Sequence, residues 1–319
     1  MLDIMTLGEV LIDLTQTGTE KGIGQFAANP GGAPANVAVA AARLGARTGF
    51  IGKVGKDSFG QTLKETLAEN GVDITGLYET AEAPTTLAIV SVGSDGERSF
   101  AFYRDPGADT LLCREEVIEA LQQEALKPVF LHMGSLSLTA EPVREATFEA
   151  VRQAKKLGSF ISYDPNYRAN LWPDEATAVR WMRALLTAAD VLKISDEELP
   201  LLTGTEDPAA GSLQLSEDGG IPLIVITLGG EGVFYRLGAE TGIVPGCRVK
   251  VADTNGAGDT FFGALLSRLA VRAGGPLDGL TVSELEDYLR FANRAAALTC
   301  SRSGAIPAMP TIDELTVKE

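Results

Sequence analysis

The sequence predicts an α/β protein in which a mostly parallel central sheet is flanked by helices. Over most of the 319 residues, short apolar runs alternate with segments of helical period, as in successive βα units. Hydrophobic residues make up 45% of the chain and charged residues 22%, which is ordinary for a globular domain. No repeat, low-complexity stretch or linker interrupts the pattern. Residues 1–319 are therefore expected to form a single domain.

The first quarter of the chain contains two predicted βα units. Residues 4–12 predict the first strand, and 34–44 the first helix, because its apolar residues recur on one face. Residues 48–54 predict the next strand. Ser58 and Gln61 have the spacing of a capping box, which predicts that a second helix begins there.

Two alternating segments, 85–92 and 98–104, differ from this pattern. They flank a Gly-Ser-Asp-Gly stretch at 93–96, which predicts a hairpin with a turn of the Asp-Gly type. A hairpin inserted into a βα series is expected to form a small flap or lid.

The remaining elements follow in the same alternating order. We expect strands at 128–133, 159–164, 190–195, 222–227, 232–236 and 247–252, and helices at about 142–157, 175–188, 257–273 and 283–300.

The charge and the N-terminal sequence exclude several classes of partner. With 43 acidic and 27 basic residues the formal charge is −16, so neither nucleic acid nor an anionic membrane is an expected partner. No apolar run reaches the ~18 residues of a membrane span, and the first residues do not resemble a signal peptide. A cytoplasmic location is expected.

Histidine and cysteine chemistry is not expected. The only histidine, His132, is expected to pack in the core or behind a site. Cys113, Cys247 and Cys300 are an odd number without metal-ligand spacing, and they fit small buried residues in a reducing compartment. Carboxylates are therefore the candidates for acid–base work.

The most informative segment is Asp-Thr-Asn-Gly-Ala-Gly-Asp at 253–259, between an expected strand and a long helix. Small residues at Gly256, Ala257 and Gly258 allow the backbone to approach a bound group, and amides at a helix N-terminus favour an anion. Asp259 could accept the proton of an attacking hydroxyl. From these residues alone, Asp259 is equally well explained as a helix cap.

Competing phosphate-binding motifs do not match. The Gly-Lys pairs at 52–53 and 55–56 are followed by Val54 and Asp57, which excludes a P-loop. Phe261 stands where a dinucleotide fingerprint needs glycine, which argues against a dehydrogenase. The sequence motifs of protein kinases are absent.

A second glycine-rich cluster, Asn-Pro-Gly-Gly-Ala-Pro-Ala-Asn at 29–36, also leads into a helix. Gly31 and Gly32 permit close backbone approach, and the Asn36 amide offers a donor and acceptors suited to sugar hydroxyls. Asp13, at the end of the first expected strand, could accept two hydroxyl hydrogen bonds. A tight turn before a helix and a solvated carboxylate would explain the same residues.

The two clusters, about 220 residues apart, resemble the signature motifs of the ribokinase-like (PfkB) carbohydrate kinase family. The resemblance extends from Gly8 to Pro307, and its first motif is most similar to that of bacterial and plant fructokinases. It implies a three-layer ribokinase-like fold with a small β lid from about 13–30 and 84–105. It also implies an ATP-dependent sugar kinase that uses Mg²⁺.

The resemblance implies roles residue by residue. Asp259 matches the catalytic base, and Gly256, Ala257 and Gly258 match the anion hole. Sugar-binding positions are matched by Asp13, Gly32 and Asn36, with Gly31 beside them. The loop 227–232 matches the nucleotide loop, which makes Thr227, Gly229, Gly230 and Gly232 candidates for ATP contacts. Asn293 matches a position near the adenine, and Lys193 lies close to where related fructokinases contact ATP.

Two parts of the family pattern concern metal ions. The family's Asn-x-x-Glu motif appears as Ser195-Asp-Glu-Glu198, so Glu198 keeps the acidic role of holding Mg²⁺ through water. The family's potassium site would use Asp253, Asn255, Ser301 and Gly304, mostly through backbone carbonyls.

The choice of sugar is open at this point. The lid would carry Phe102, Tyr103 and Arg104 towards the sugar, and Arg104 with Arg168 could bind a carboxylate, which suits 2-keto-3-deoxygluconate. The first motif favours D-fructose, converted to fructose 6-phosphate. A nucleotide-binding protein without catalysis is the alternative from another class. Exposed lid edges also predict a homodimer formed through the lids.

Overall fold

The computed structural model describes residues 1–20, 23–92 and 98–316. The strands are β1 (Leu2–Leu7), β2 (Leu11–Glu20), β3 (Ile23–Gly31), β4 (Thr48–Gly55), β5 (Val72–Thr80), β6 (Leu87–Val92), β7 (Arg98–Tyr103), β8 (Pro128–Gly134), β9 (Phe160–Asp164), β10 (Val191–Ser195), β11 (Leu223–Thr227), β12 (Gly232–Leu237) and β13 (Glu240–Pro245). The α-helices are α1 (Ala33–Arg43), α2 (Ser58–Glu69), α3 (Arg114–Gln122), α4 (Val143–Lys156), α5 (Glu175–Leu186), α6 (Leu199–Thr203), α7 (Pro208–Gly219), α8 (Ala257–Ala270), α9 (Val282–Cys300) and α10 (Ile312–Thr316).

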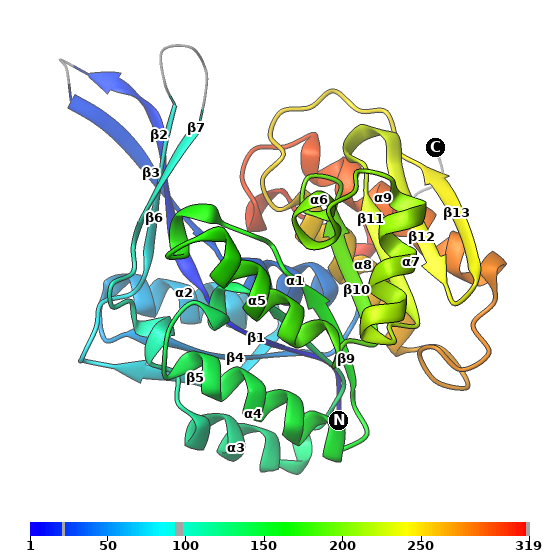
Figure 1. The fold of residues 1–319 in the computed structure, drawn as a ribbon. Coiled ribbons are helices and arrows are strands. Elements are labelled where there is room, and N and C mark those ends of the chain that lie inside the picture. Colours follow the sequence, from blue (N-terminus) through cyan, green and yellow to red (C-terminus); the bar gives the residue numbers. More distant parts are fainter. Residues whose placement is uncertain (21–22, 93–97, 317–319) are drawn as a thin grey trace.

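A nine-stranded sheet forms the centre of the molecule (Figure 1). Its order is β13-β12-β11-β10-β9-β8-β1-β4-β5, and all pairs are parallel except β11 with β12 and β12 with β13. After β1 the chain adds β4 and β5 on one side of the sheet, and then β8, β9, β10 and the later strands on the other side. The switch point of the sheet therefore lies between β1 and β8. In such sheets a crevice opens at this switch point, outside the carboxyl ends of the strands.

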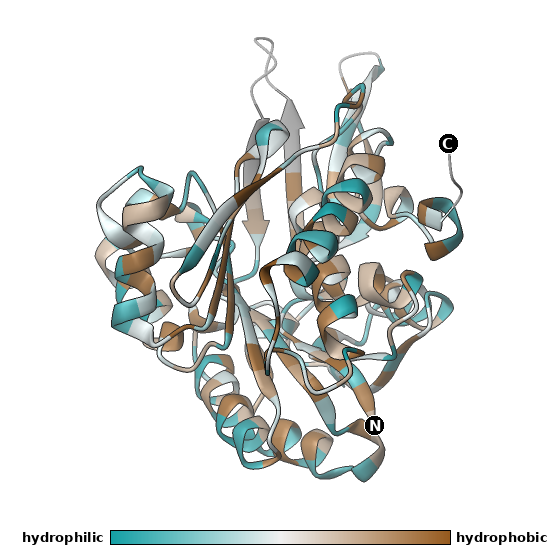
Figure 2. Cartoon of the chain, turned by 90° about the vertical axis from the view of Figure 1, so that its right-hand side faces the viewer, coloured by the Kyte–Doolittle hydropathy of each residue, from teal (hydrophilic) through white to brown (hydrophobic). Residues whose placement is uncertain are grey.

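Both faces of the central sheet are buried, which explains the continuous apolar runs. In β11, Ile224 and Ile226 belong to one hydrophobic cluster, and Leu223 and Val225 belong to a second one on the opposite face. Figure 2 shows hydrophobic residues along the central strands and hydrophilic ones on the outer sides of many helices. The result is a three-layer α/β fold, as expected.

A second, four-stranded sheet of order β3-β2-β6-β7 projects from the main body (Figure 1). Its strands lie mostly within the two segments predicted to form a lid, 13–30 and 84–105. The β6–β7 pair is antiparallel, as expected for a hairpin. The predicted turn at 93–96 lies outside the described residues.

The expectation of one strand over 4–12 is wrong. β1 ends at Leu7 and β2 begins at Leu11, because the chain leaves the large sheet there and enters the small one. Gly8 lies between them with φ 149°, and a side chain there would meet Pro34 at 2.7 Å. The apolar run continues through the break and hides it.

Three smaller expectations also need correction. The cap of α2 is Asp57, whose carboxylate accepts from the Gly60 amide, and Ser58 is the first helical residue. Residues 247–252 do not form a strand, since the partner of β12 is β13. Cys247 is exposed rather than buried, while Cys113 and Cys300 are partly buried and all three are free thiols.

Candidate active site

A cavity of about 310 Å³ lies at the carboxyl ends of the central strands. Its lining comes from regions that are distant in sequence, among them the small-sheet strands β2, β6 and β7, the start of α1, the segment after β9 and the start of α8. Among the predicted sugar-site residues it contains Asp13, Gly32, Asn36, Arg168 and Asp259. The fold therefore brings together both glycine-rich clusters.

A second cavity, of about 560 Å³, lies on the other side of the α8 N-terminus. It contains the predicted nucleotide residues Thr227, Gly229, Gly230, Gly232 and Asn293. The Asn293 amide donates to the carbonyls of Val244 and Pro245, which holds α9 against β13. Thr254 and Gly258 line both cavities, so the two cavities adjoin there.

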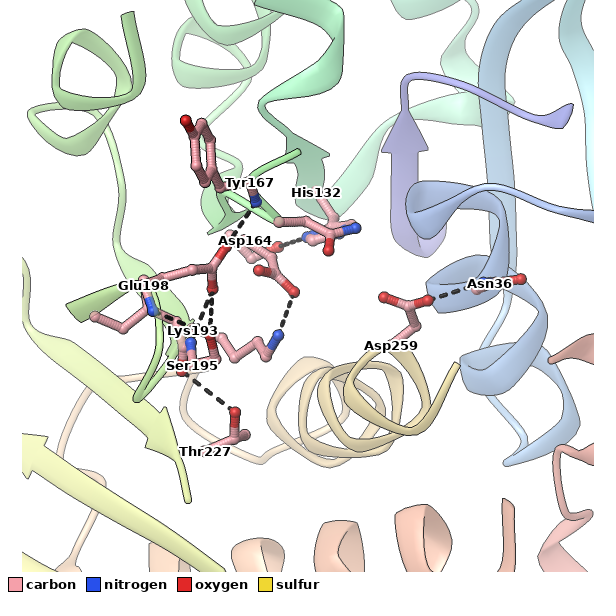
Figure 3. A network of polar contacts seen from close by, with 12 residues as sticks. Asn36, His132, Asp164, Tyr167, Lys193, Ser195, Glu198, Thr227 and Asp259 are labelled. Carbon is pink, nitrogen blue, oxygen red and sulfur yellow. Dashed lines mark hydrogen bonds and ion pairs between the residues drawn. The ribbon is translucent and has the colours of Figure 1, made fainter. Parts of the chain in front are cut away.

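Asp259 lies in the first turn of α8, where it faces the smaller cavity (Figure 3). Its Oδ2 accepts a 2.8 Å hydrogen bond from the Asn36 side chain. The pKa of Asp259 is raised to about 6, chiefly by burial and also by the nearby Asp164 charge, while the Asn36 hydrogen bond opposes the rise. At neutral pH Asp259 is therefore ionised in most of the molecules, and its carboxylate can accept a proton.

Asp13 faces the same cavity from β2. Its pKa is raised to about 6, chiefly by burial and also by the charge of Asp259, while Arg168 opposes the rise. A side-chain carbon at Gly31 would lie 2.3 Å from Oδ2 of Asp13. The glycine is thus required by a close approach across the β2–β3 pair, where Leu11 is its register partner.

Glu9 also lines this cavity, although neither motif predicted it. Its Oε1 accepts from the Ala33 amide at 3.1 Å, and so occupies an N–H group at the start of α1. Burial raises the pKa of Glu9 to about 7. Gly32, at φ 105°, permits this turn, because a side chain there would meet the Glu9 carbonyl at 2.6 Å. The one signal in the sequence that could have pointed to Glu9 is its position between Gly8 and the first motif.

Lys193 and Asp164 form a buried ion pair next to Asp259 (Figure 3). Lys193 Nζ lies 2.7 Å from Asp164 Oδ2. Burial lowers the pKa of Lys193, but the carboxylates of Asp164 and Glu198 raise it above its ordinary value. The ammonium charge is therefore maintained inside the protein.

Glu198 is fixed by three hydrogen bonds at the end of β10. The Ser195 amide and hydroxyl donate to Oε2, and the Tyr167 amide donates to Oε1 at 2.7 Å (Figure 3). The serine that replaces the family's asparagine thus orients the carboxylate. Within the described ranges, no group of three or more His, Cys, Asp or Glu side chains could hold a metal ion.

The single histidine is not suited to acid–base chemistry. His132 is 1% exposed, and burial together with the charge of Lys193 lowers its pKa to about 3. Its ring packs edge-on against Phe262 with centroids 5.2 Å apart. This is the packing role that was expected.

Of the three residues predicted to reach the sugar from the lid, Phe102, Tyr103 and Arg104, the last two do not line the cavity. Arg104 is buried and directed at Asp109, Thr139 and the Leu136 carbonyl. Tyr103 is 63% exposed, whereas its neighbour Phe102 lines the cavity. Neighbouring strand residues point to opposite faces, which the sequence alone could not assign.

The residues proposed for a potassium site join two segments near the α8 N-terminus. The Asp253 carboxylate accepts from the Asn255 amide at 3.0 Å and from the Gly304 amide at 3.1 Å. Ser301 is exposed, and its hydroxyl donates to the Leu298 carbonyl. The loop before α8 is thereby tied to the segment after α9.

Residues 1–312 match the model of the pfkB family carbohydrate kinases. The chain belongs to this family. Fructokinase-1 of Oryza sativa subsp. japonica is 40% identical over 312 residues, which cover 97% of this chain and 94% of that protein. This assignment to the pfkB family rests on nearly the whole chain.

Solved structures agree with the pfkB assignment. A fructokinase from Xylella fastidiosa with bound ATP has a TM-score of 0.90 and 37% identity, covering 98% of this chain and 96% of that one. A double mutant of a Vibrio cholerae O395 fructokinase, in a fructose-, ADP- and potassium-bound form, has a TM-score of 0.87 and 36% identity, covering 98% and 97%. In the described part of this pfkB kinase, no helix is long and apolar enough to cross a membrane.

Proposed function

We propose that this protein transfers the γ-phosphoryl group of ATP to the primary hydroxyl of D-fructose, giving fructose 6-phosphate and ADP. The observation that carries the proposal is that the two cavities adjoin at Thr254 and Gly258, one residue from Asp259. Relatives named fructokinase, about 40% identical over almost the full length, support the same substrates.

Asp259 serves as the base in this reaction. As the hydroxyl oxygen attacks the γ-phosphorus, its O–H bond breaks and the proton passes to the Asp259 carboxylate. The bond from the γ-phosphorus to the β–γ bridging oxygen breaks, and its electron pair leaves with ADP. Asp259 then releases the proton to solvent. Because the transition state is loose, alignment and charge stabilisation supply most of the acceleration.

The start of α8 supplies the charge stabilisation. Gly256, Ala257 and Gly258 begin a helix of 14 residues, whose first amides have no partner one turn back. Such amides, with the partial positive charge of the helix terminus, stabilise a phosphoryl group whose charge is redistributing.

The sugar is held by the residues of the smaller cavity. Asp13, Gly31, Gly32 and Asn36 are our proposed sugar contacts, with Arg168 at the rim. Fructose is favoured over 2-keto-3-deoxygluconate because the Arg104 guanidinium is already bonded to Asp109. A two-arginine carboxylate clamp would have to give up that buried ion pair.

ATP occupies the larger cavity beside the loop 227–232, with Asn293 near the adenine and Lys193 near the phosphates. Mg²⁺ bound to ATP would neutralise charge on the phosphates. The fixed Glu198 carboxylate fits a contact to that ion through water, as is usual for Mg²⁺, which keeps several water ligands.

Potassium is proposed to bind between the segments that Asp253 joins, with Asn255, Ser301 and Gly304 contributing. Support comes from the two hydrogen bonds of the Asp253 carboxylate, which hold these segments together next to the anion hole. We expect higher turnover in potassium than in tetramethylammonium buffer at equal ionic strength. Equal turnover in both would contradict the proposal.

The small sheet is proposed to act as a lid and as a dimer interface. Ile23, Phe26 and Tyr103 are large hydrophobic residues exposed on it, at 72%, 45% and 63%. Such residues favour pairing with a second copy. Light scattering should give a dimer at micromolar concentration, and Ile23→Lys should shift it towards the monomer. A wild-type monomer would refute this interface.

Three free thiols support the proposed cytoplasmic location.

The deciding experiment measures ADP release with Mg-ATP and a panel of sugars: fructose, ribose, 2-keto-3-deoxygluconate, tagatose 6-phosphate and adenosine. We expect turnover on fructose, and Asp259→Asn should lower kcat by ~10²–10⁴-fold, the usual value of general-base help. Turnover only on the keto acid would overturn the choice of fructose. Near-full turnover by Asp259→Asn would overturn the assigned base.

A further inference from the structure

Like the Arg104–Asp109 pair, the ion pair between Asp164 and Lys193 has both side chains almost fully buried. Their exposed fractions are 3% and 7%, and Nζ lies 2.7 Å from Oδ2. Removing two charges from water costs free energy, and well-packed apolar residues often stabilise a fold as well as a buried pair does. Stability alone therefore does not explain why this pair stands here.

The pair adjoins the place where a phosphoryl group would cross between the cavities. A side-chain carbon at Gly258 would lie 3.2 Å from Lys193 Nζ, and Gly258 lines both cavities. Lys193 itself lines the smaller cavity with Asp259. Figure 3 shows the Lys193 side chain reaching from its strand to Asp164, with Asp259 across the gap.

The geometry leaves hydrogen-bonding capacity on both partners. An ammonium carries three N–H donors, and the contact with Asp164 uses one of them. Among the described residues, Oδ1 of Asp164 is a buried oxygen without a hydrogen-bond partner. The carboxylate is thus held in place through one oxygen, while Lys193 can still donate to a phosphoryl oxygen.

We propose that Asp164 is a positioning residue that holds the Lys193 ammonium against the transferring phosphoryl group. This inference rests on the proposed kinase function. Donors that are fixed before the reaction stabilise developing charge without reorganising during it. A buried lysine without a carboxylate partner also tends to lose its proton, and with it the charge that the phosphoryl group needs.

Steady-state kinetics separate positioning from a purely structural role. Lys193→Gln should lower kcat by about 10²-fold, comparable to the loss of one anion-hole donor. Asp164→Asn keeps the shape and an acceptor oxygen, and should lower kcat at least about 10-fold with little change in the KM for fructose. Because Asp164 acts through Lys193, the double variant should match Lys193→Gln within about twofold. Additive losses would overturn the proposal.

Nucleotide binding gives a readout that needs no sugar and no turnover. Since Lys193 contacts the transferred group, Asp164→Asn should weaken binding of the ATP analogue AMP-PNP and leave ADP binding unchanged, measured by calorimetry. Equal losses for both nucleotides would indicate a damaged site and overturn the proposal. If the wild type turned over no sugar, the proposed function would fail, and the two affinities would still decide the role of Asp164.

The pH profile is a second readout. The charged groups that face Lys193 are the carboxylates of Asp164, Glu198 and Asp259, and the neighbouring His132 is neutral. Removing the Asp164 charge should move the alkaline limb of kcat to lower pH. An unmoved limb together with normal kcat would refute the role.

Asp3→Asn provides the matched control. Asp3 is also a buried carboxylate in the parallel sheet, and it pairs with Arg47 at 2.7 Å, but it lies at the opposite, amino end of the strands. Asp3→Asn should lower the melting temperature without changing kcat or the ratio of the affinities for AMP-PNP and ADP. A loss of kcat in this control as large as in Asp164→Asn would assign the effect to stability and overturn the proposal.

Discussion

The side-chain amide of Asn36 donates a 2.8 Å hydrogen bond to Oδ2 of Asp259, joining residues 223 positions apart. Asn36 lies in α1 and Asp259 in α8, two helices that pack side by side on one face of the sheet. The bond fixes the carboxylate and favours its ionised form. Several properties of the enzyme should follow from this contact and its neighbours.

The pH dependence of turnover should have an acidic limb. The pKa of Asp259 is raised to about 6, and only the ionised carboxylate can take the sugar proton. kcat/KM for fructose should therefore level off at neutral pH and fall at least about tenfold per unit below pH 6. A profile that stays level down to pH ~5 would contradict the raised pKa.

Asn36→Ala should shift that limb towards higher pH. The lost hydrogen bond had lowered the pKa of Asp259, so the carboxyl should hold its proton more tightly in the variant. The matched control is Asn70→Ala, which removes a partner of Arg43 at the other end of α1. An unchanged limb in Asn36→Ala would show that the bond does not control the ionisation of Asp259.

Gly31→Ala should weaken sugar binding. The added carbon would lie 2.3 Å from Oδ2 of Asp13, so the carboxylate must move. We expect a higher KM for fructose, with kcat reduced less. Gly18→Ala, on the same strand pair, has no atom within 4 Å of its added carbon and should behave like wild type. Equal KM values for Gly31→Ala and wild type would argue against Asp13 as a sugar ligand.

Asp57→Ala should destabilise the protein, because Asp57 caps α2 and also accepts from the amide and hydroxyl of Thr85, just before β6. Loss of such a cap typically costs ~1–2 kcal/mol. Burial raises the pKa of Asp57, but these hydrogen bonds lower it by more, so the folded-state pKa lies below the ordinary value. The stability that Asp57 contributes is therefore fully present at neutral pH and is lost as the pH falls through the folded-state pKa.

Asp174→Ala is the comparison for Asp57→Ala. Asp174 caps α5 through the amide and hydroxyl of Thr177 and is exposed. Its loss should lower the melting temperature less than the loss of Asp57, measured by thermal unfolding at neutral pH. The reverse order would mean that the contact between Asp57 and Thr85 contributes nothing.

The sequence predicted the layers of the fold because βα alternation reports burial directly. It failed where chain direction changes without a change in polarity, as between Leu7 and Leu11. It also misplaced the strand after β12, since 247–252 is apolar enough to pair but the tight β12–β13 hairpin takes that edge. Local composition predicts neither the break between Leu7 and Leu11 nor which segment pairs with β12.

The candidate site was predictable where motifs cluster and less so where single side chains decide. The two glycine-rich segments placed Asn36 and Asp259 in one cavity. Arg104 was expected to face the sugar, but its partner Asp109 cannot be found from spacing. Glu9 carries no motif of its own, and the pairing of Asp164 with Lys193 joins two strands that only the sheet order brings together.

The boundary formed by Thr254 and Gly258 also determines the stereochemistry of the reaction. Because the two cavities adjoin there, both substrates can be bound at once. The phosphoryl group can then pass directly from ATP to the sugar, without a covalent intermediate on the protein. A single in-line displacement reverses the arrangement of the oxygens around phosphorus. A γ-phosphate made chiral with sulfur and oxygen isotopes should therefore appear on the sugar with inverted configuration.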